Sequence, residues 1–401
     1  MTPDPGPAPD WRRNQIAVTV AAFVGFTGFT LVMPFLPLYL DQLGTHDPGA
    51  ILIWSGLSLG ITPAITALMA PFWARLADRY GRKLMVARSL FSFVVIMSAT
   101  AFVTAPWQVL ALRALQGVFA GYGMLAMTMA AESAPPDRMA DAIGWVQTAQ
   151  RIGPALGPMI GGTLAQTFGL RQTFLISAAF YLGACILVLV GYREHRTPRP
   201  KAPAPAAPAV SWRTLRQTPH FVLFVATIFG LQLVDRSFGP ILPLYLREVG
   251  QSEASVPFLS GMIFSITAAA AAIGNQVTGW LLTRASVGYL VPAGAGVAAA
   301  AAAAFGAGAP PAVLMAAGAL FGAGLGVATT AIYTGASAAV SSAARGVAFG
   351  YLTRAYLVGL AVSPVLAGLV GALSMRAVFI ADGGALVAMA YTLNRRMKQE
   401  S

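Results

Sequence analysis

The sequence predicts an all-α membrane protein whose twelve transmembrane helices form two pseudo-symmetric six-helix halves, with both termini in the cytoplasm. Three observations support this prediction: few charged residues, twelve long apolar stretches and an internal repeat. Charged residues make up 10% of the chain and hydrophobic residues 57%, whereas a typical soluble domain has roughly 25% charged residues. This number of charges is too small to cover a water-exposed surface of this size. The excess apolar surface must therefore face lipid.

Twelve stretches are long and apolar enough to cross a bilayer, which takes about 20 residues. The first six predicted spans are 15–40, 50–72, 84–103, 107–130, 141–167 and 172–192. The second six are 219–246, 257–283, 287–306, 312–339, 346–371 and 376–394. They give a bundle at 15–192 and another at 219–394. The basic, Pro/Ala-rich segment 193–218 is predicted to be a cytoplasmic linker, residues 1–14 a disordered tail, and residues 395–401 a C-terminal tail.

The basic residues gather on one side of the predicted membrane. The tails, the linker and the loops on the side of the N-terminus hold most of the Lys and Arg, whereas the opposite side holds Arg171, Arg247 and Arg376. This bias predicts that both termini are cytoplasmic in a bacterial-type inner membrane. Attraction of these loops to anionic lipid also explains the net charge of +12 without a nucleic-acid partner. The single Cys185 and the scattered histidines give no disulfide framework or zinc spacing, so neither a metal nor another cofactor is expected.

The internal repeat begins with PFLPLYLDQLG at 34–44 and PILPLYLREVG at 240–250, an offset of 206 positions. It continues at the same offset between the fifth and eleventh spans. The fifth span holds Gly144, Gly153, Gly157, Pro158, Gly161 and Gly162, and the eleventh holds Gly350, Gly359, Ser363, Pro364, Ala367 and Gly368. The second and eighth spans match similarly, with Gly56 and Gly60 against Gly261 and Ser265. A duplicated six-helix unit explains all of these matches.

Small residues also recur at every fourth position of these two spans. The stripes are Ala149, Gly153, Gly157, Gly161 and Ala165, and Ala355, Gly359, Ser363, Ala367 and Gly371. Such stripes let helix backbones approach closely in a membrane. Static packing and a sliding contact between the halves are both compatible with the pattern.

Three motifs resemble those of the major facilitator superfamily. The fifth-span pattern from Gly144 to Gly162 resembles the antiporter motif of its drug:proton exporters, and LALRALQG (110–117) resembles their fourth-span motif. ARLADRYGRK (74–83) resembles the signature loop, with Ala74 in place of its first glycine. The whole chain is similar to MdtG-type multidrug efflux proteins of the twelve-span drug:proton antiporter branch. This resemblance implies a monomeric, proton-coupled exporter that confers antibiotic resistance and has its substrate site between the halves.

The signature loop supplies the predicted cytoplasmic gate, formed by Asp78, Arg79, Gly81 and Arg82. Asp78 is expected to bind a neighbouring helix end when the cytoplasmic side closes. The alternative is a solvated charge cluster that only sets topology, since exposed ion pairs contribute little. The equivalent turn of the second half carries Thr283 in place of the acid.

Charged residues within the spans are few, and each is costly enough to be a functional candidate. Asp235 in the seventh span is the predicted proton-coupling carboxylate, and Arg113 is its predicted partner in proton transfer because it resembles the fourth-span arginine of the exporters. Arg236 points about 100° away from Asp235 around the helix, so it is expected to contact substrate or another acid. A structural ion pair is the alternative for Asp235. Asp382 is expected to reach the membrane interface.

Aromatic, Met and polar residues on the presumed cavity helices are the candidates for substrate contact, because bulky amphipathic compounds need adaptable apolar surfaces. They are Phe26, Met33, Gln116, Tyr122, Met124, Gln232, Arg236, Phe238 and Tyr333. Packing within one half or against lipid is the alternative for each. A lipid or glycolipid flippase and a metabolite exporter are the alternative functions on the same fold. The sequence shows no nucleophile–base pair and no phosphate-binding loop, so an enzyme is not expected.

Overall fold

The computed structural model describes residues 11–193, 212–341 and 344–398, and this part of the chain contains helices and no strand. The N-terminal bundle consists of α1 (Trp11–Thr30), α2 (Leu36–Gln42), α3 (Pro48–Tyr80), α4 (Arg82–Thr100), α5 (Pro106–Phe119), α6 (Tyr122–Ser133), α7 (Met139–Phe168) and α8 (Leu170–Gly191). Short 3₁₀ turns, η1 (Met33–Phe35) and η2 (Pro136–Arg138), precede α2 and α7. The C-terminal bundle consists of α10 (Phe221–Glu248), α11 (Val256–Leu281), α12 (Val287–Gly306), α13 (Pro311–Ala339), α14 (Arg345–Leu373) and α15 (Met375–Lys398), preceded by the short α9 (Trp212–Gln217).

The predicted membrane fold is confirmed. Eleven stretches of the described chain are helices of suitable length and composition for a span, with α1–α2 and α5–α6 each forming one of them. The twelfth is α7, which has 30 residues and is therefore long enough to cross a bilayer. Its glycines, glutamines and Arg151 make it less apolar than the others. It can carry them because it packs between α1 and α11.

Helices extend into the two predicted tails because α1 and α15 continue past their apolar segments into charged residues, and the predicted linker contains a short separate helix. Helix α1 begins at Trp11, inside the predicted tail 1–14, of which residues 1–10 lie outside the described part. Helix α9 lies in the predicted linker 193–218, whose residues 194–211 also lie outside it. Helix α15 extends to Lys398, into the predicted tail 395–401. Hydropathy marks where a helix leaves the lipid, and the backbone hydrogen bonds need not end there.

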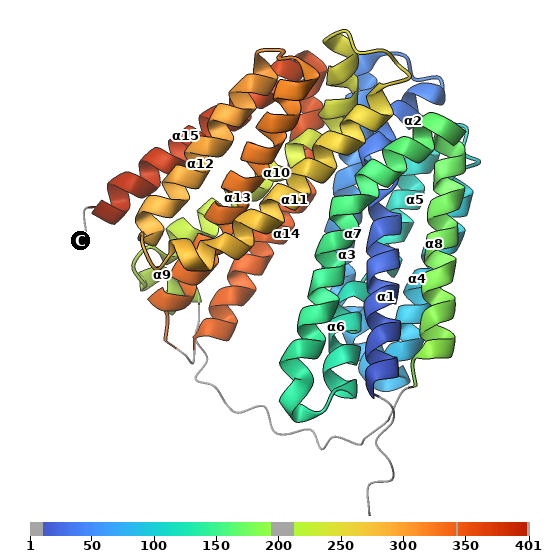
Figure 1. The fold of residues 1–401 in the computed structure, drawn as a ribbon, viewed down its shortest axis with the longest axis horizontal. Helices are drawn as coiled ribbons and strands as arrows, with labels where there is room; N and C mark the ends of the chain where they lie inside the picture. The colour runs from blue at the N-terminus through green and yellow to red at the C-terminus, as the bar shows by residue number, and fades with distance from the viewer. Residues whose placement is uncertain (1–10, 194–211, 342–343, 399–401) are drawn as a thin grey trace, which may run out of the picture.

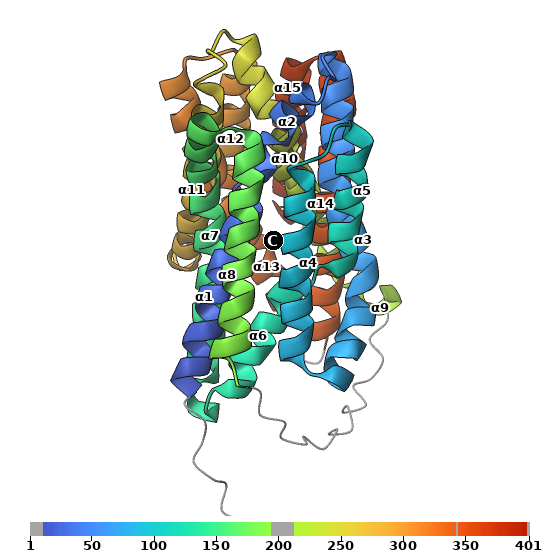
Figure 2. The ribbon, with the colours of Figure 1, turned by 90° about the vertical axis from the view of Figure 1, so that its right-hand side faces the viewer.

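The two bundles lean against each other at one end and diverge toward the other (Figure 1). We call the first the closed end. The other, where α8 ends and where α9 lies, is the linker end. Viewed at 90°, the helices of the N-terminal bundle run between these two ends, with α2 near the closed end and α6 near the linker end (Figure 2).

The duplicated segment has the same structural role in each bundle. Tyr39 and Tyr245 are the equivalent tyrosines of the two Leu-Tyr-Leu triplets, and both are fully buried. The Tyr39 hydroxyl donates a hydrogen bond to the carbonyl oxygen of Thr100 at 2.6 Å, and the Tyr245 hydroxyl donates to that of Phe305. Thr100 and Phe305 lie at the same end of the third span of their bundles. Each tyrosine therefore ties the first span to the third at the closed end.

The fourth span is broken, although the sequence predicted one continuous helix over 107–130. Helix α5 ends at Phe119, and α6 begins at Tyr122 after Gly121, whose φ of 124° is unfavourable for a residue with a side chain. The freed carbonyls are satisfied by side chains of neighbouring spans. Trp73 donates to the carbonyl of Val118, and Ser89 donates to that of Phe119. Such a break is tolerated at membrane depth only where protein replaces the lost partners.

Candidate substrate and coupling site

The bundles contact each other where α3 crosses α14 and where α7 crosses α11. These two crossings are equivalent positions of the internal repeat. A Cβ on Gly56 would overlap the carbonyl oxygen of Pro364, and a Cβ on Gly261 would overlap that of Pro158. Gly56 and Gly261 are repeat equivalents, as are Pro364 and Pro158. The helix backbones are therefore in direct contact, and only glycine fits at either crossing.

The predicted small-residue stripes pack inside each bundle. A Cβ on Gly153 or Gly157 would meet atoms of α1, a Cβ on Gly161 would meet Leu31 directly after α1, and Gly359 faces α10 in the same way. The alternative of static packing therefore describes the stripes. The contact between the bundles comes from the adjacent face of α7, where Gly162 meets the backbone of Pro257. Gly144, the first glycine of the antiporter motif, has open space beside it at the linker end.

Polar contacts also join the bundles on the closed side. Arg247 at the end of α10 forms an ion pair with Asp41 at the end of α2, with Nη1 and Oδ2 2.6 Å apart. The backbone N–H of Met159 donates to Ser265 Oγ at 2.9 Å. Helices α3 and α14 also approach there, since a Cβ on Gly49 would lie 3.5 Å from the Cβ of Ala372. Sequence reasoning missed the Asp41–Arg247 pair, although the two residues stand at the same position of the repeat with opposite charges.

The predicted gate residues lie at the linker end of α3 and α4. Asp78 is exposed and pairs with Arg82 at 3.8 Å, and Arg82 also forms an ion pair with Glu132 of α6. Gly81 forms the turn between the two helices with a φ of 97°, and the Arg79 guanidinium lies 5.3 Å from the centre of the Tyr80 ring. Asp78 thus makes its ion pair within its own bundle while the bundles are apart at this end.

The predicted geometry of Asp235 and Arg236 is wrong. Arg236 Nε lies 2.9 Å from Asp235 Oδ2, so the two form an ion pair. The angle between their Cα–Cβ directions did not prevent this, because the arginine side chain is long and flexible enough to fold back over its neighbour. Arg236 also interacts with Tyr356 of α14. The side chains of Asp235 and Arg236 are 29% and 48% exposed, so both remain accessible.

Arg113 lies elsewhere, in the interior of the N-terminal bundle. Its side chain is 2% exposed and donates to Gln116 Oε1 at 2.6 Å. Among the described residues, Arg113 Nη2, Gln116 Nε2 and the Tyr181 hydroxyl have no hydrogen-bond partner. Arg113 and Asp235 form no ion pair with each other in the described chain. The structure therefore does not bring the two predicted coupling residues together in this conformation.

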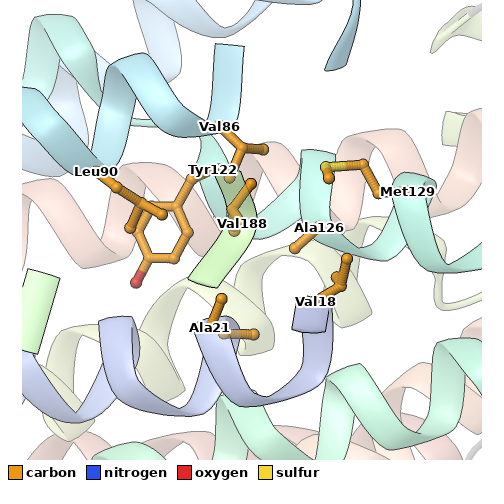
Figure 3. Close-up of a pocket in the computed structure, with 9 residues that line it drawn as sticks. Val18, Ala21, Val86, Leu90, Tyr122, Ala126, Met129 and Val188 are labelled. Atoms are coloured by element: carbon orange, nitrogen blue, oxygen red, sulfur yellow. The ribbon is translucent and has the colours of Figure 1, made fainter. Parts of the chain in front are cut away.

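The aromatic candidates divide between the bundles. Phe26 packs on Tyr122 with ring centres 5.2 Å apart, and Tyr122 lines a small apolar cavity inside the N-terminal bundle together with Leu90 and Val188 (Figure 3). Phe238 does not face the space between the bundles. It is buried in the C-terminal bundle against three other rings, Phe305, Phe321 and Phe379, so the alternative of packing within one half applies to it.

The remaining candidates differ in exposure. Gln232 is buried on α10 where it meets Gly359. Tyr333 is partly buried and stacks on Phe349. Met124 is 69% exposed and Met33 is partly buried.

Comparisons with known proteins agree with this architecture. The family model described as the Major Facilitator Superfamily matches residues 18–311. The chain is 36% identical over 274 residues to the multidrug resistance protein MdtG of Proteus mirabilis (strain HI4320), covering 68% of each protein. It is 38% identical over 277 residues to MdtG of Escherichia coli (strain K12 / DH10B), covering 69% of this chain and 67% of the relative.

Solved structures of low sequence identity share the fold. A bacterial homolog of the human lysosomal transporter Spinster, in an inward-facing and occupied conformation, matches with a TM-score of 0.78 at 18% identity, covering 98% of both chains. A D-xylose-proton symporter matches with a TM-score of 0.72 at 15% identity, covering 95% of this chain and 97% of the other. At these identities the likeness concerns the fold alone.

Proposed function

This chain belongs to the major facilitator superfamily, in its MdtG-type group, and we propose that it exports small amphipathic compounds across a bacterial inner membrane in exchange for protons. The observation that carries the proposal is the 36–38% identity to MdtG multidrug resistance proteins over 68–69% of the chain. Pro158 and Gly162 of the antiporter-type motif support it, because they lie at one of the two crossings between the bundles. A single chain contains both halves of the site, so the protein acts as a monomer.

In this proposal, alternating access means that the closed end and the linker end of the bundles open in turn. The linker end carries most of the Lys and Arg, so we assign it and both termini to the cytoplasm. The conformation described is therefore open toward the cytoplasm, with Asp41–Arg247 and the two glycine crossings sealing the periplasmic side. In the opposite conformation these contacts break, and Asp78 and its loop meet the C-terminal bundle at the cytoplasmic side. We assign the gating role to that loop on this basis.

Asp235 couples the two movements in this proposal. As a carboxylate it is held by Arg236, and it also offers the negative charge that a cationic compound needs. A proton on Asp235 removes that charge, so the proton and the compound compete for one site. Arg236 can turn to Tyr356 when the compound is bound, since it already interacts with that residue.

Transport in proteoliposomes with an imposed pH gradient tests this proposal, with ethidium as the fluorescent probe. Wild-type protein is expected to dissipate the gradient when ethidium moves. Asp235→Asn, which resembles the protonated acid, is expected to lose this proton flux and to bind the cation ethidium more weakly. Asp47→Asn is the matched control, because Asp47 only caps α3 by accepting a hydrogen bond from the Ala50 N–H, and asparagine caps a helix equally well.

Two outcomes contradict the proposal in different ways. Full coupling in Asp235→Asn would move the proton role to another acid. No probe-dependent proton flux in the wild-type protein, across a panel of amphipathic cations and neutral compounds, would remove the antiport function. Translocation of labelled lipid by the same vesicles would then support the flippase alternative.

A further inference from the structure

Asp382 on α15 is a buried acid to which the transport cycle above gives no role. The sequence predicted that it reaches the membrane interface, and this is wrong. Its side chain is 9% exposed and lies against α10, where its Oδ2 is 2.5 Å from Ser237 Oγ. It is six residues from Arg376 near the start of the helix, which places it about 9 Å along the axis inside the span.

Ser237 Oγ makes two short contacts that bear on the protonation of Asp382. A serine hydroxyl has one hydrogen to donate. Ser237 Oγ lies 2.9 Å from the carbonyl oxygen of Val234, which can only accept, and 2.5 Å from Asp382 Oδ2. The one serine hydrogen can serve either acceptor, so both contacts are hydrogen bonds at the same time only when Asp382 supplies a second hydrogen. Asp382 then donates to Ser237 as a neutral carboxylic acid.

The charges around Asp382 agree with a neutral acid. Among the described residues no Arg, Lys or His forms an ion pair with it. On α10, the nearby Asp235 and Arg236 are paired with each other. On α15 itself, Arg376 pairs with Glu248 of α10 at the closed end. An ionised carboxylate left without a partner inside a membrane is costly, which favours the protonated form.

The other helices of the bundle supply no cation either. Helices α12 and α13 carry no charged residue, and α12 faces this part of α15 with Ala299 and Ala302. Phe379, one turn before Asp382, packs on Phe238 and Phe305. The ionisable residues of α12, α13 and α14, none of which interacts with Asp382, are Tyr289, Tyr333, Arg345, Tyr351, Arg354 and Tyr356.

We propose that Asp382 and Ser237 form a proton-binding site between α10 and α15, occupied in this conformation and emptied when α10 shifts within its own bundle, away from α15, as the two bundles rock. Helix α10 connects this site to the rest of the protein, because it carries Asp235 and Arg236 directly before Ser237 and Arg247 of the closed end. When α10 moves, Oδ2 exchanges its serine acceptor for water. The O–H bond breaks, the proton passes to water, and a carboxylate remains. The occupied site rests on geometry alone, whereas its emptying during transport rests on the proposed function.

Infrared spectroscopy of the lipid-reconstituted protein tests the occupied site. The wild-type protein should show the carbonyl stretch of a protonated carboxylic acid at neutral pH. Asp382→Asn, which keeps the shape and can still donate to Ser237, should remove one such band. Ser237→Ala should shift it to the position of a weaker hydrogen bond, and the exposed Asp47→Asn should leave it unchanged. Identical spectra for wild type and Asp382→Asn would show that Asp382 is ionised and would overturn the proposal.

A disulfide that locks the closed end tests the emptying, without any transported compound. In the variant with Gly49→Cys and Ala372→Cys, the band should persist to higher pH when the disulfide is formed than after reduction. Loss of the band at the same pH in both forms would show that the proton does not leave through this movement. Because neither measurement uses a substrate, a failure here is distinct from a failure of drug:proton exchange.

Discussion

Asp41 and Arg247 occupy the same position in the two copies of the repeat, yet they carry opposite charges and bind each other across the closed end. Both side chains are about one-quarter exposed, at 24% and 27%. A pair this exposed contributes at most on the order of 1 kcal/mol to stability. A contribution of this size suits a contact that must break in every transport cycle.

A charge exchange at this pair tests its role. Asp41→Arg places two arginines together and should shift the population toward the conformation open at this end by about fivefold, the equivalent of roughly 1 kcal/mol. Combining Asp41→Arg with Arg247→Asp should restore the wild-type population. Distances between spin labels on the exposed Gln172 and Ala254, one on each bundle, measure the shift. A double variant as open as the single variant would show that the residues do not act as a pair.

The sequence identifies the charged residues of the seventh span, but it does not predict the contacts that they make. Asp235 was singled out because charge inside a membrane is expensive, and that argument needs no coordinates. Its pairing with Arg236 depends on how a flexible side chain folds back, and the burial of Asp382 depends on how α15 is turned against α10. Neither is encoded in hydropathy or in helical periodicity.

At the scale of the helices, the glycines that matter for access are those at the crossings of α3 with α14 and of α7 with α11. Extra atoms in a tightly packed contact typically cost about 1–3 kcal/mol. Gly56→Ala and Gly261→Ala should therefore each lower the population of this conformation by about 5–150-fold, and the same spin-label pair measures the change. Gly183→Ala in α8 is the control, because a Cβ there meets nothing within 4 Å. Equal populations for the control and the crossing variants would contradict the assigned role of these glycines.

The internal repeat predicted which helices are equivalent. The structure adds which of their residues contact each other across the two bundles. The match of Gly56 with Gly261 and of Pro158 with Pro364 was visible in the sequence, but the pairing of Gly56 with Pro364 across the bundles was not. The break between α5 and α6 also escaped prediction. Its freed carbonyls are satisfied by Trp73 and Ser89 from other spans, and such tertiary partners leave no local signal in the fourth span.

At the scale of the whole molecule, the register of the crossings continues toward the linker end. Gly56 contacts Pro364, and Gly60 contacts Ala361. The residue number on α14 therefore falls as the residue number on α3 rises toward the linker end. The same register pairs Gly350 with Ala70, two exposed residues in the part where the bundles now diverge. Rocking of the two bundles about the crossings should bring this second pair together when the closed end opens.

Two engineered disulfides test this rocking movement. Gly49→Cys with Ala372→Cys should oxidise readily in the conformation described, because the 3.5 Å between their Cβ positions matches the separation in disulfides of about 3.5–4.5 Å. Transport should stop on oxidation and recover on reduction. Gly350→Cys with Ala70→Cys should oxidise only when the closed end is open, so Asp41→Arg should accelerate it. The native Cys185 is buried and leaves the background low. Transport that continues with the first disulfide formed, or simultaneous formation of both disulfides in one molecule, would rule out alternating access by rocking of the bundles.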